Sequence, residues 1–204
     1  MGTIKYDTAF RNATNLLGRL DVKDICQRCG AEYTDERIRI SYLGSDCSID
    51  TRSYAFLPDH IPQTERILIL HYLTSSADKP GVGDNSSQDF VSYQSLPGGM
   101  FYYPTFRKRG PEWLTYVFSD RPELLPAAGG PFGAKQGSFG DISVIIPVLP
   151  KIEIAVVIFK GDEEFPTELK FLFRPDIVDY LTLEDIAILG GVVAGRLRRN
   201  VKTS

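Results

Sequence analysis

Three short apolar segments in the second half of the chain constrain its fold more than any other feature. They are residues 142–146, 152–159 and 169–173. The first two are continuous apolar runs, which are typical of buried strands. Pro147 and Pro150 mark a turn between them. In the third segment, apolar residues alternate with others, as they do on a strand with one buried face. We therefore expect these segments to pair in one sheet.

The first half of the chain predicts further strands and two helices. Ile38, Ile40 and Tyr42 alternate with polar residues, and a turn at Gly44-Ser45-Asp46 leads to partner strands within residues 47–57. The short connections favour an antiparallel meander. Before it, residues 10–20 have helical spacing, and Asp21 and Gly30 are suited to cap a second short helix.

Two more helices complete the expected architecture. Residues 62–73 are apolar on every side in the middle, so this helix should be central and buried. Thr182 and Asp185 begin the last helix with a capping box. Residues 78–88, which are rich in Gly, Asp, Asn and Ser, predict a loop. We predict a single α+β domain over residues 1–204, with a mostly antiparallel sheet packed with helices from the N-terminus, middle and C-terminus.

Composition excludes several classes of function. The net charge of -3 provides no general attraction to nucleic acid or to anionic lipid. No apolar stretch is long enough to span a bilayer, and the polar N-terminal residues do not resemble a signal peptide. Three cysteines form no disulfide framework. We therefore expect a cytoplasmic protein that binds neither membranes nor nucleic acid.

The segment Lys160-Gly-Asp-Glu-Glu-Phe-Pro166 is the first candidate for chemistry. Asp162, Glu163 and Glu164 stand between two strongly apolar segments. Adjacent carboxylates repel each other, so a cation, a metal or water must compensate for them. They are candidates for metal-assisted hydrolysis or acid/base catalysis, with His71 as a further candidate base. The simpler interpretation is an exposed hairpin loop whose charges discourage aggregation.

A second candidate site begins at Leu96-Pro-Gly-Gly-Met-Phe-Tyr-Tyr103. Glycines allow a ligand to approach the backbone, and aromatic side chains can form an apolar pocket. Arginines can bind a carboxylate or phosphate. The alternative is a turn followed by a helix that faces the core. The predicted ligand-binding residues are Gly98, Gly99, Phe101, Tyr102, Arg107 and Arg109.

The cysteines and histidines indicate a metal site only weakly. Cys26 and Cys29 form a CxxC pair, with Cys47 and His60 as possible further ligands, but no second CxxC or HxxxH pair is present. The helical pattern places both cysteines of the pair on an apolar stripe, where cysteine packs as a small hydrophobic residue. His71 lies on a nearly continuous apolar helix, which is typical of a core histidine. We predict no metal and no particular cofactor.

Several segments, in order, resemble the prokaryotic domain-of-unknown-function 3786 family. They are ILILHYL at 67–73, SLPGGMFY at 95–102, GDEEFP at 161–166 and YLTLEDIA at 180–187. The resemblance covers nearly the whole chain. It implies an intracellular protein of an anaerobe, with relatives encoded near, or fused to, iron–sulfur and corrinoid one-carbon proteins. It assigns no catalytic residue, and the Cys-rich extension of the fused relatives is missing, which argues against a bound cluster.

These observations lead to a functional hypothesis and an alternative. We expect an accessory or binding module in anaerobic cofactor or one-carbon metabolism, which binds a small molecule, a corrinoid-type cofactor or a partner protein. The alternative is an enzyme that uses the acidic segment. Gly190, Gly191 and Gly195 on the last helix allow close packing within the chain, and a homodimer through this helix is a further alternative.

Overall fold

The protein is an α+β protein in which residues group into two compact units. The computed structural model describes residues 2–75 and 89–203. The first unit contains the described residues up to position 75, with 149–151 and 179–181, and the second unit contains most of the rest. The predicted fold class and the antiparallel strand pairing are confirmed. The strands form two sheets, whereas we expected one. The loop predicted at residues 78–88 lies outside the described residues.

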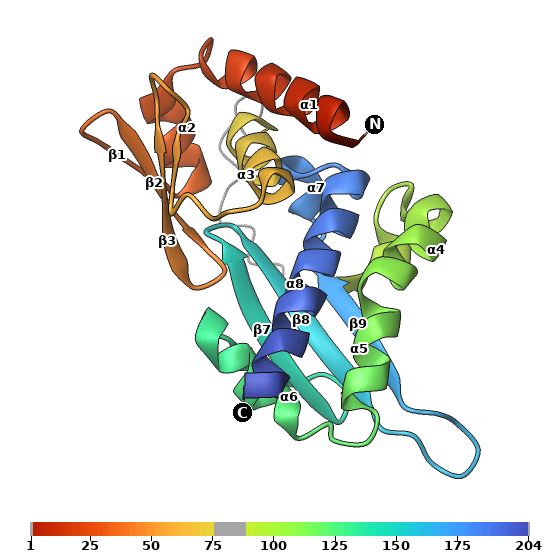
Figure 1. Cartoon of the computed structure of the whole chain (residues 1–204). Coiled ribbons are helices and arrows are strands. Elements are labelled where there is room, and N and C mark those ends of the chain that lie inside the picture. Colours follow the sequence, from red (N-terminus) through yellow and green to blue (C-terminus); the bar gives the residue numbers. More distant parts are fainter. Residues whose placement is uncertain (1, 76–88, 204) are drawn as a thin grey trace. The chain divides into compact units, whose positions relative to one another are not determined.

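The first unit combines an antiparallel four-stranded sheet with helices (Figure 1). Its strands lie in sequence order, which confirms the predicted meander. The helices are α1 (Gly2–Leu17), α2 (Val22–Cys29) and α3 (Gln63–Ser75), and the strands are β1 (Glu32–Thr34), β2 (Arg37–Tyr42), β3 (Ser45–Asp50) and β4 (Phe56–Leu57).

Two tight turns set the register of this sheet. Asp35 and Glu36 connect β1 to β2, and Leu43 and Gly44 connect β2 to β3, all four with φ between 49° and 73°. Paired positive φ angles are typical of the two-residue turns that join antiparallel strands. The turn expected at Gly44-Ser45-Asp46 therefore lies one residue earlier. Ser45 and Asp46 belong to β3, so the carboxylate of Asp46 lies on the sheet.

Local sequence explains how the helices of this unit begin, end and pack. The carboxylate of Asp21 accepts hydrogen bonds from the backbone N–H groups of Lys23 and Asp24, and Gly30 ends α2 with φ of 68°. Both predicted caps are confirmed. In α3 the middle of the helix is buried, as predicted, and Leu68 and Leu70 are almost completely inaccessible to solvent.

The second unit contains an antiparallel five-stranded sheet in the order β5-β9-β8-β7-β6. Its strands are β5 (Val91–Ser92), β6 (Lys135–Gln136), β7 (Ile142–Leu149), β8 (Ile152–Phe159) and β9 (Glu168–Phe173). Its α-helices are α4 (Gly99–Arg109), α5 (Pro111–Phe118), α6 (Leu124–Gly129) and α8 (Leu183–Thr203). The residues of the short α7 (Ile177–Tyr180) are divided between the two units.

The apolar segments form the central strands as predicted, with one difference. Pro147 lies inside β7, and only Pro150 belongs to the turn. Proline lacks an N–H group and is tolerated in a strand where no neighbour needs that donor. The short strand β6 pairs with β7 only at Val144 and Ile145. Pro147 therefore lies beyond the end of this ladder.

Close packing holds α4 and α8 together. A Cβ added at Gly190 of α8 would lie 2.8 Å from the Phe106 ring of α4. Phe106 in turn stacks on Tyr93, with 4.2 Å between ring centroids. The predicted capping box also forms, because Asp185 and Thr182 exchange backbone and side-chain hydrogen bonds. In the described part of the chain, no helix is long and apolar enough to cross a membrane.

Candidate functional site

Two large aromatic side chains of α5 are exposed to solvent. Trp113 is 56% exposed and Tyr116 is 81% exposed, whereas Leu114 and Phe118 on the opposite side of the helix are completely buried. The buried pair packs α5 into the second unit, and the helical repeat then directs Trp113 and Tyr116 outward. Exposed large apolar side chains that gather on one surface mark interaction sites more often than isolated ones do.

Two hollows flank this pair of side chains. The first has a volume of about 590 Å³ and is lined by Lys108, Glu112, Trp113, Tyr116, Val117 and Arg198. The second has a volume of about 350 Å³ and lies between the α4–α5 region and residues 166–169. Glu112 and Tyr116 line both. We call the residues that line the two hollows the α5 surface. Figure 1 shows α4 and α5 in green beside α8 and β9.

The junction between α4 and α5 positions this surface. Gly110 ends α4, and Pro111 occupies the first position of α5, where a proline is tolerated because that N–H group has no partner within the helix. A Cβ at Gly110 would lie 3.1 Å from the carbonyl oxygen of Gly190, so the junction packs directly on the backbone of α8. This contact brings the C-terminal part of α8, with Arg198, to the first hollow.

The charge of the α5 surface is positive. Lys108, Arg198 and Arg107 line the hollows. Arg198 lies over the Trp113 ring, with 5.3 Å from its guanidinium carbon to the centroid, which is a cation–π contact.

The carboxylates of this surface compensate only part of that charge. Glu112 lies 3.7 Å from Arg107, and Glu168 is paired with Lys170 at 2.9 Å. Lys108 has no ion pair in the described parts of the chain. The surface therefore combines aromatic rings with unneutralised cations.

The predicted aromatic and arginine residues are only partly brought together. Arg107 lines the second hollow with Tyr103. Phe101 and Tyr102 are 89% and 48% exposed in the first turns of α4, and they line neither hollow. Tyr103 and the α5 aromatics lie where we had expected Phe101 and Tyr102.

The two predicted glycines are required by packing. A Cβ at Gly99 would clash with the carbonyl oxygen of Tyr93, and Gly98 has φ of 77° beside the side chain of Leu183. The space beside these glycines is therefore occupied by other parts of the chain, and it leaves no room for a ligand. The backbone of Arg109 lies near Gly191, within the α4–α8 contact.

The acidic residues 162–164 form an exposed turn between β8 and β9. The Asp162 carboxylate accepts hydrogen bonds from the N–H groups of Glu164 and Phe165, at 2.9 and 2.8 Å. These backbone donors, Phe165 foremost, hold the pKa of Asp162 below its ordinary value. Across the described ranges, no three acidic, histidine or cysteine residues are grouped so that they could bind a metal ion.

The CxxC pair lies in the interior of the first unit. Cys26 and Cys29 are buried, and burial raises the pKa of the Cys26 thiol to about 11, with a smaller contribution from Cys29. The thiol of Cys29 contacts the carbonyl oxygens of Tyr72 and Leu73 at 3.8 Å. Protonated, buried thiols are poor metal ligands and poor nucleophiles. The packing interpretation of the pair agrees with this environment.

The remaining candidates do not form a cluster with the CxxC pair. Cys47 is buried, and desolvation raises the pKa of its thiol to about 11. His60 is exposed in the loop before α3. His71 is half-buried on α3 and belongs to the first unit, whereas residues 162–164 belong to the second.

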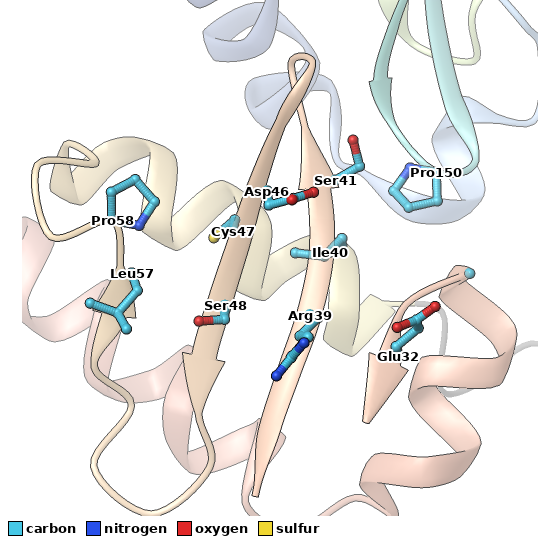
Figure 2. A pocket seen from close by; sticks show the side chains of 11 residues that line it. Glu32, Arg39, Ile40, Ser41, Asp46, Cys47, Ser48, Leu57, Pro58 and Pro150 are labelled. Carbon is cyan, nitrogen blue, oxygen red and sulfur yellow. The ribbon is translucent and has the colours of Figure 1, made fainter. Parts of the chain in front are cut away.

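A third hollow, of about 830 Å³, lies on the first unit (Figure 2). It covers the outer face of the β1–β4 sheet. Its polar lining comes from Glu32, Arg39, Ser41, Asp46 and Ser48. We had interpreted the polar positions of β2 only as the solvent side of a half-buried strand. The alternation revealed the face, but only the register between strands shows which side chains meet on it.

Comparison with protein families decides the family of the chain. The model described as "Domain of unknown function (DUF3786)" matches residues 21–196. The chain belongs to this family. The predicted resemblance is thereby confirmed, and the match includes α4, α5 and most of α8. No curated protein and no solved structure matches the chain.

Proposed function

We propose that this protein is a non-enzymatic accessory module that binds an acidic partner protein through the α5 surface. The observation that carries the proposal is the exposure of Trp113 and Tyr116 beside Arg198 and Lys108. Tryptophan, tyrosine and arginine are the residue types that dominate the binding energy of protein interfaces. The excess of cations favours a partner with a complementary acidic surface.

The shape of the α5 surface supports a protein partner over a small molecule. Small-molecule sites enclose most of their ligand. Here Tyr116 is 81% exposed and lines two separate hollows, so it projects as a ridge with a hollow on either side. A partner that places one side chain in each hollow would bury Tyr116 between them and exclude water from it.

The family resemblance extends this proposal to a cellular role. We propose that the module works in the cytoplasm of an anaerobe, in cofactor or one-carbon metabolism, and that its partner is an iron–sulfur or corrinoid protein. The resemblance implies relatives that are encoded near such proteins or fused to them, and this expectation motivates the proposed partner. The partner would carry the cofactor, and this chain would contribute the docking surface.

The test compares what the wild-type protein and two variants bind. Trp113→Ala/Tyr116→Ala removes the aromatic pair of the α5 surface. Met100→Ala/Phe101→Ala removes exposed apolar side chains that lie outside both hollows, and it serves as the matched control. We expect a partner purified with the wild-type protein to lose affinity by about thirtyfold or more for the first variant, since two anchoring residues are truncated.

Salt provides the second measurement on the same purified pair. Affinity should fall as ionic strength rises, because exposed charges on the two surfaces are screened. Equal binding by the α5 variant and the control would overturn the proposal. So would an affinity that does not depend on salt.

A further inference from the structure

Arg39 on β2 lines the hollow on the β1–β4 sheet. Strand register places it directly opposite Glu32 on β1 and Ser48 on β3. Figure 2 shows Arg39 between these two residues. In the described part of the chain, no carboxylate lies within ion-pair distance of its guanidinium group. Its hydrogen-bond donors are therefore open to the hollow.

The neighbouring Arg37 differs in this respect. Its guanidinium group lies 3.8 Å from the Asp50 carboxylate and donates a hydrogen bond of 3.1 Å to the Ser48 hydroxyl. Because Ser48 accepts this bond, its own hydroxyl hydrogen remains free to donate. Residues directly opposite on neighbouring strands have Cβ atoms about 5 Å apart. Ser48 and Arg39 can thus donate to the same carboxylate group.

The hollow also carries negative charge. Glu32 and Asp46 line it together with Arg39, so its lining has two carboxylates and one cation. A ligand with several negative charges would be repelled by this arrangement. A ligand with one carboxylate and one ammonium group would be matched, with the ammonium group beside Glu32.

The remaining lining is apolar. Leu57 is 52% exposed at the edge strand β4, with Pro58 next to it in the chain, and Pro150 lines the opposite side of the hollow, near Gly30 (Figure 2). The volume of about 830 Å³ falls within the range of about 300–1,000 Å³ that is usual for small-molecule sites. An apolar side chain of a ligand could cover Leu57 and Pro58 without displacing any charged group.

We propose that this hollow binds a zwitterion of the amino-acid type with an apolar side chain. Arg39 and Ser48 bind its carboxylate, Glu32 accepts hydrogen bonds from its ammonium group, and Leu57 contacts its side chain. This site belongs to the first unit and goes beyond the proposed docking function of α5, which belongs to the second.

The test uses three related probes and amide chemical shifts of the full chain. L-leucine has all the required groups, 4-methylpentanoate lacks the ammonium group, and 3-methylbutylamine lacks the carboxylate. L-methionine and L-phenylalanine are added as alternative apolar amino acids. We expect millimolar amino acid to shift the amides of β1, β2 and β3, and each truncated probe to bind about tenfold more weakly or worse.

Two variants and a control assign the groups. Arg39→Gln should weaken leucine binding by about tenfold or more, because a charge-assisted hydrogen bond is lost. The Glu32→Gln variant should bind leucine only as tightly as the wild-type protein binds 4-methylpentanoate, because the partner of the ammonium group is lost. The variant should bind 4-methylpentanoate no more weakly than the wild-type protein does. Arg52→Gln removes the same charge from a side chain of this unit that is 78% exposed and does not line the hollow, and it should change nothing.

Three results would overturn the proposal. The first is the absence of amide shifts in the sheet with all three amino acids. The second is equal binding of leucine and 4-methylpentanoate to the wild-type protein. The third is an equal effect of Arg39→Gln and Arg52→Gln.

Discussion

Tyr72 connects distant segments of the first unit through its hydroxyl group. The hydroxyl donates a hydrogen bond of 2.7 Å to the carbonyl oxygen of Cys29, at the end of α2. It accepts one of 3.2 Å from the N–H group of Lys151. Its ring lies 5.5 Å from that of Tyr180, between centroids. Desolvation raises the pKa of Tyr72 far above its ordinary value, so the hydroxyl keeps its proton at neutral pH.

We therefore predict that Tyr72→Phe destabilises the protein. The substitution leaves a buried carbonyl oxygen and an N–H group without their partner, which costs about 1–3 kcal/mol. Tyr116→Phe is the control, because Tyr116 is 81% exposed and its change should be close to neutral. Chemical denaturation measures both free energies of unfolding. Equal values for the two variants would show that the Tyr72 hydroxyl contributes nothing.

The buried thiols lead to a second prediction at this scale. The pKa values of Cys26 and Cys47 are raised from 9.0 to about 11 by burial. Two pKa units reduce the thiolate fraction about a hundredfold at neutral pH, and alkylation requires the thiolate. Iodoacetamide should therefore modify both thiols far more slowly in the native than in the denatured protein, as followed by mass spectrometry.

The same thiols give stability a dependence on alkaline pH. The folded protein holds their protons more tightly than the unfolded chain does, because the pKa values are raised on folding. Their contribution to stability is present below pH 9 and is lost as the pH rises from 9.0 to about 11.

Rapid alkylation of either thiol of the native protein by iodoacetamide at neutral pH would contradict the buried environment of Cys26 and Cys47.

At the scale of elements, one helix contains both a packed and an open glycine. Gly190 of α8 lies against the Phe106 ring, whereas a Cβ at Gly195 would meet no atom of the described residues within 4 Å. Phe106 is held by contacts with Tyr93 and Phe173, at 4.2 and 5.7 Å between centroids, so it has little freedom to move away. Packing against Phe106 therefore requires a glycine at position 190, whereas the space at position 195 would accept a side chain.

We predict opposite effects for the two alanine substitutions. Gly190→Ala should destabilise the protein by about 1–3 kcal/mol, since it overpacks the contact between α4 and α8. Gly195→Ala should stabilise it by up to about 1 kcal/mol through helix propensity alone. Thermal and chemical unfolding of both variants would measure this. A neutral or stabilising Gly190→Ala would contradict the close packing that positions the α5 surface.

Elements whose signals are local could be predicted from the sequence. Asp21 and the pair of Thr182 with Asp185 form caps within a few residues, and these caps are present in the structure. The turn at Leu43 was misplaced by one residue because a buried leucine with φ of 49° contradicts the usual preference for glycine or asparagine.

At the scale of the whole molecule, the features that the sequence did not predict depend on contacts between residues far apart in the chain. The strands divide into two sheets, and no residue in the sequence marks that division. Arg39 and Ser48 meet only through the register of β2 with β3. The sequence contains Trp113 and Tyr116, but their exposure depends on which face of α5 packs against the protein.

The proposed function places Tyr116 at the centre of a protein interface. Site-specific photo-crosslinking tests it directly, with a photoreactive phenylalanine analogue at position 116 and, as a control, at position 165, where Phe165 is 68% exposed outside the α5 surface. We expect a discrete adduct with a single acidic protein from position 116 and none from position 165. Matching adduct patterns at the two positions, or no adduct at position 116, would contradict it.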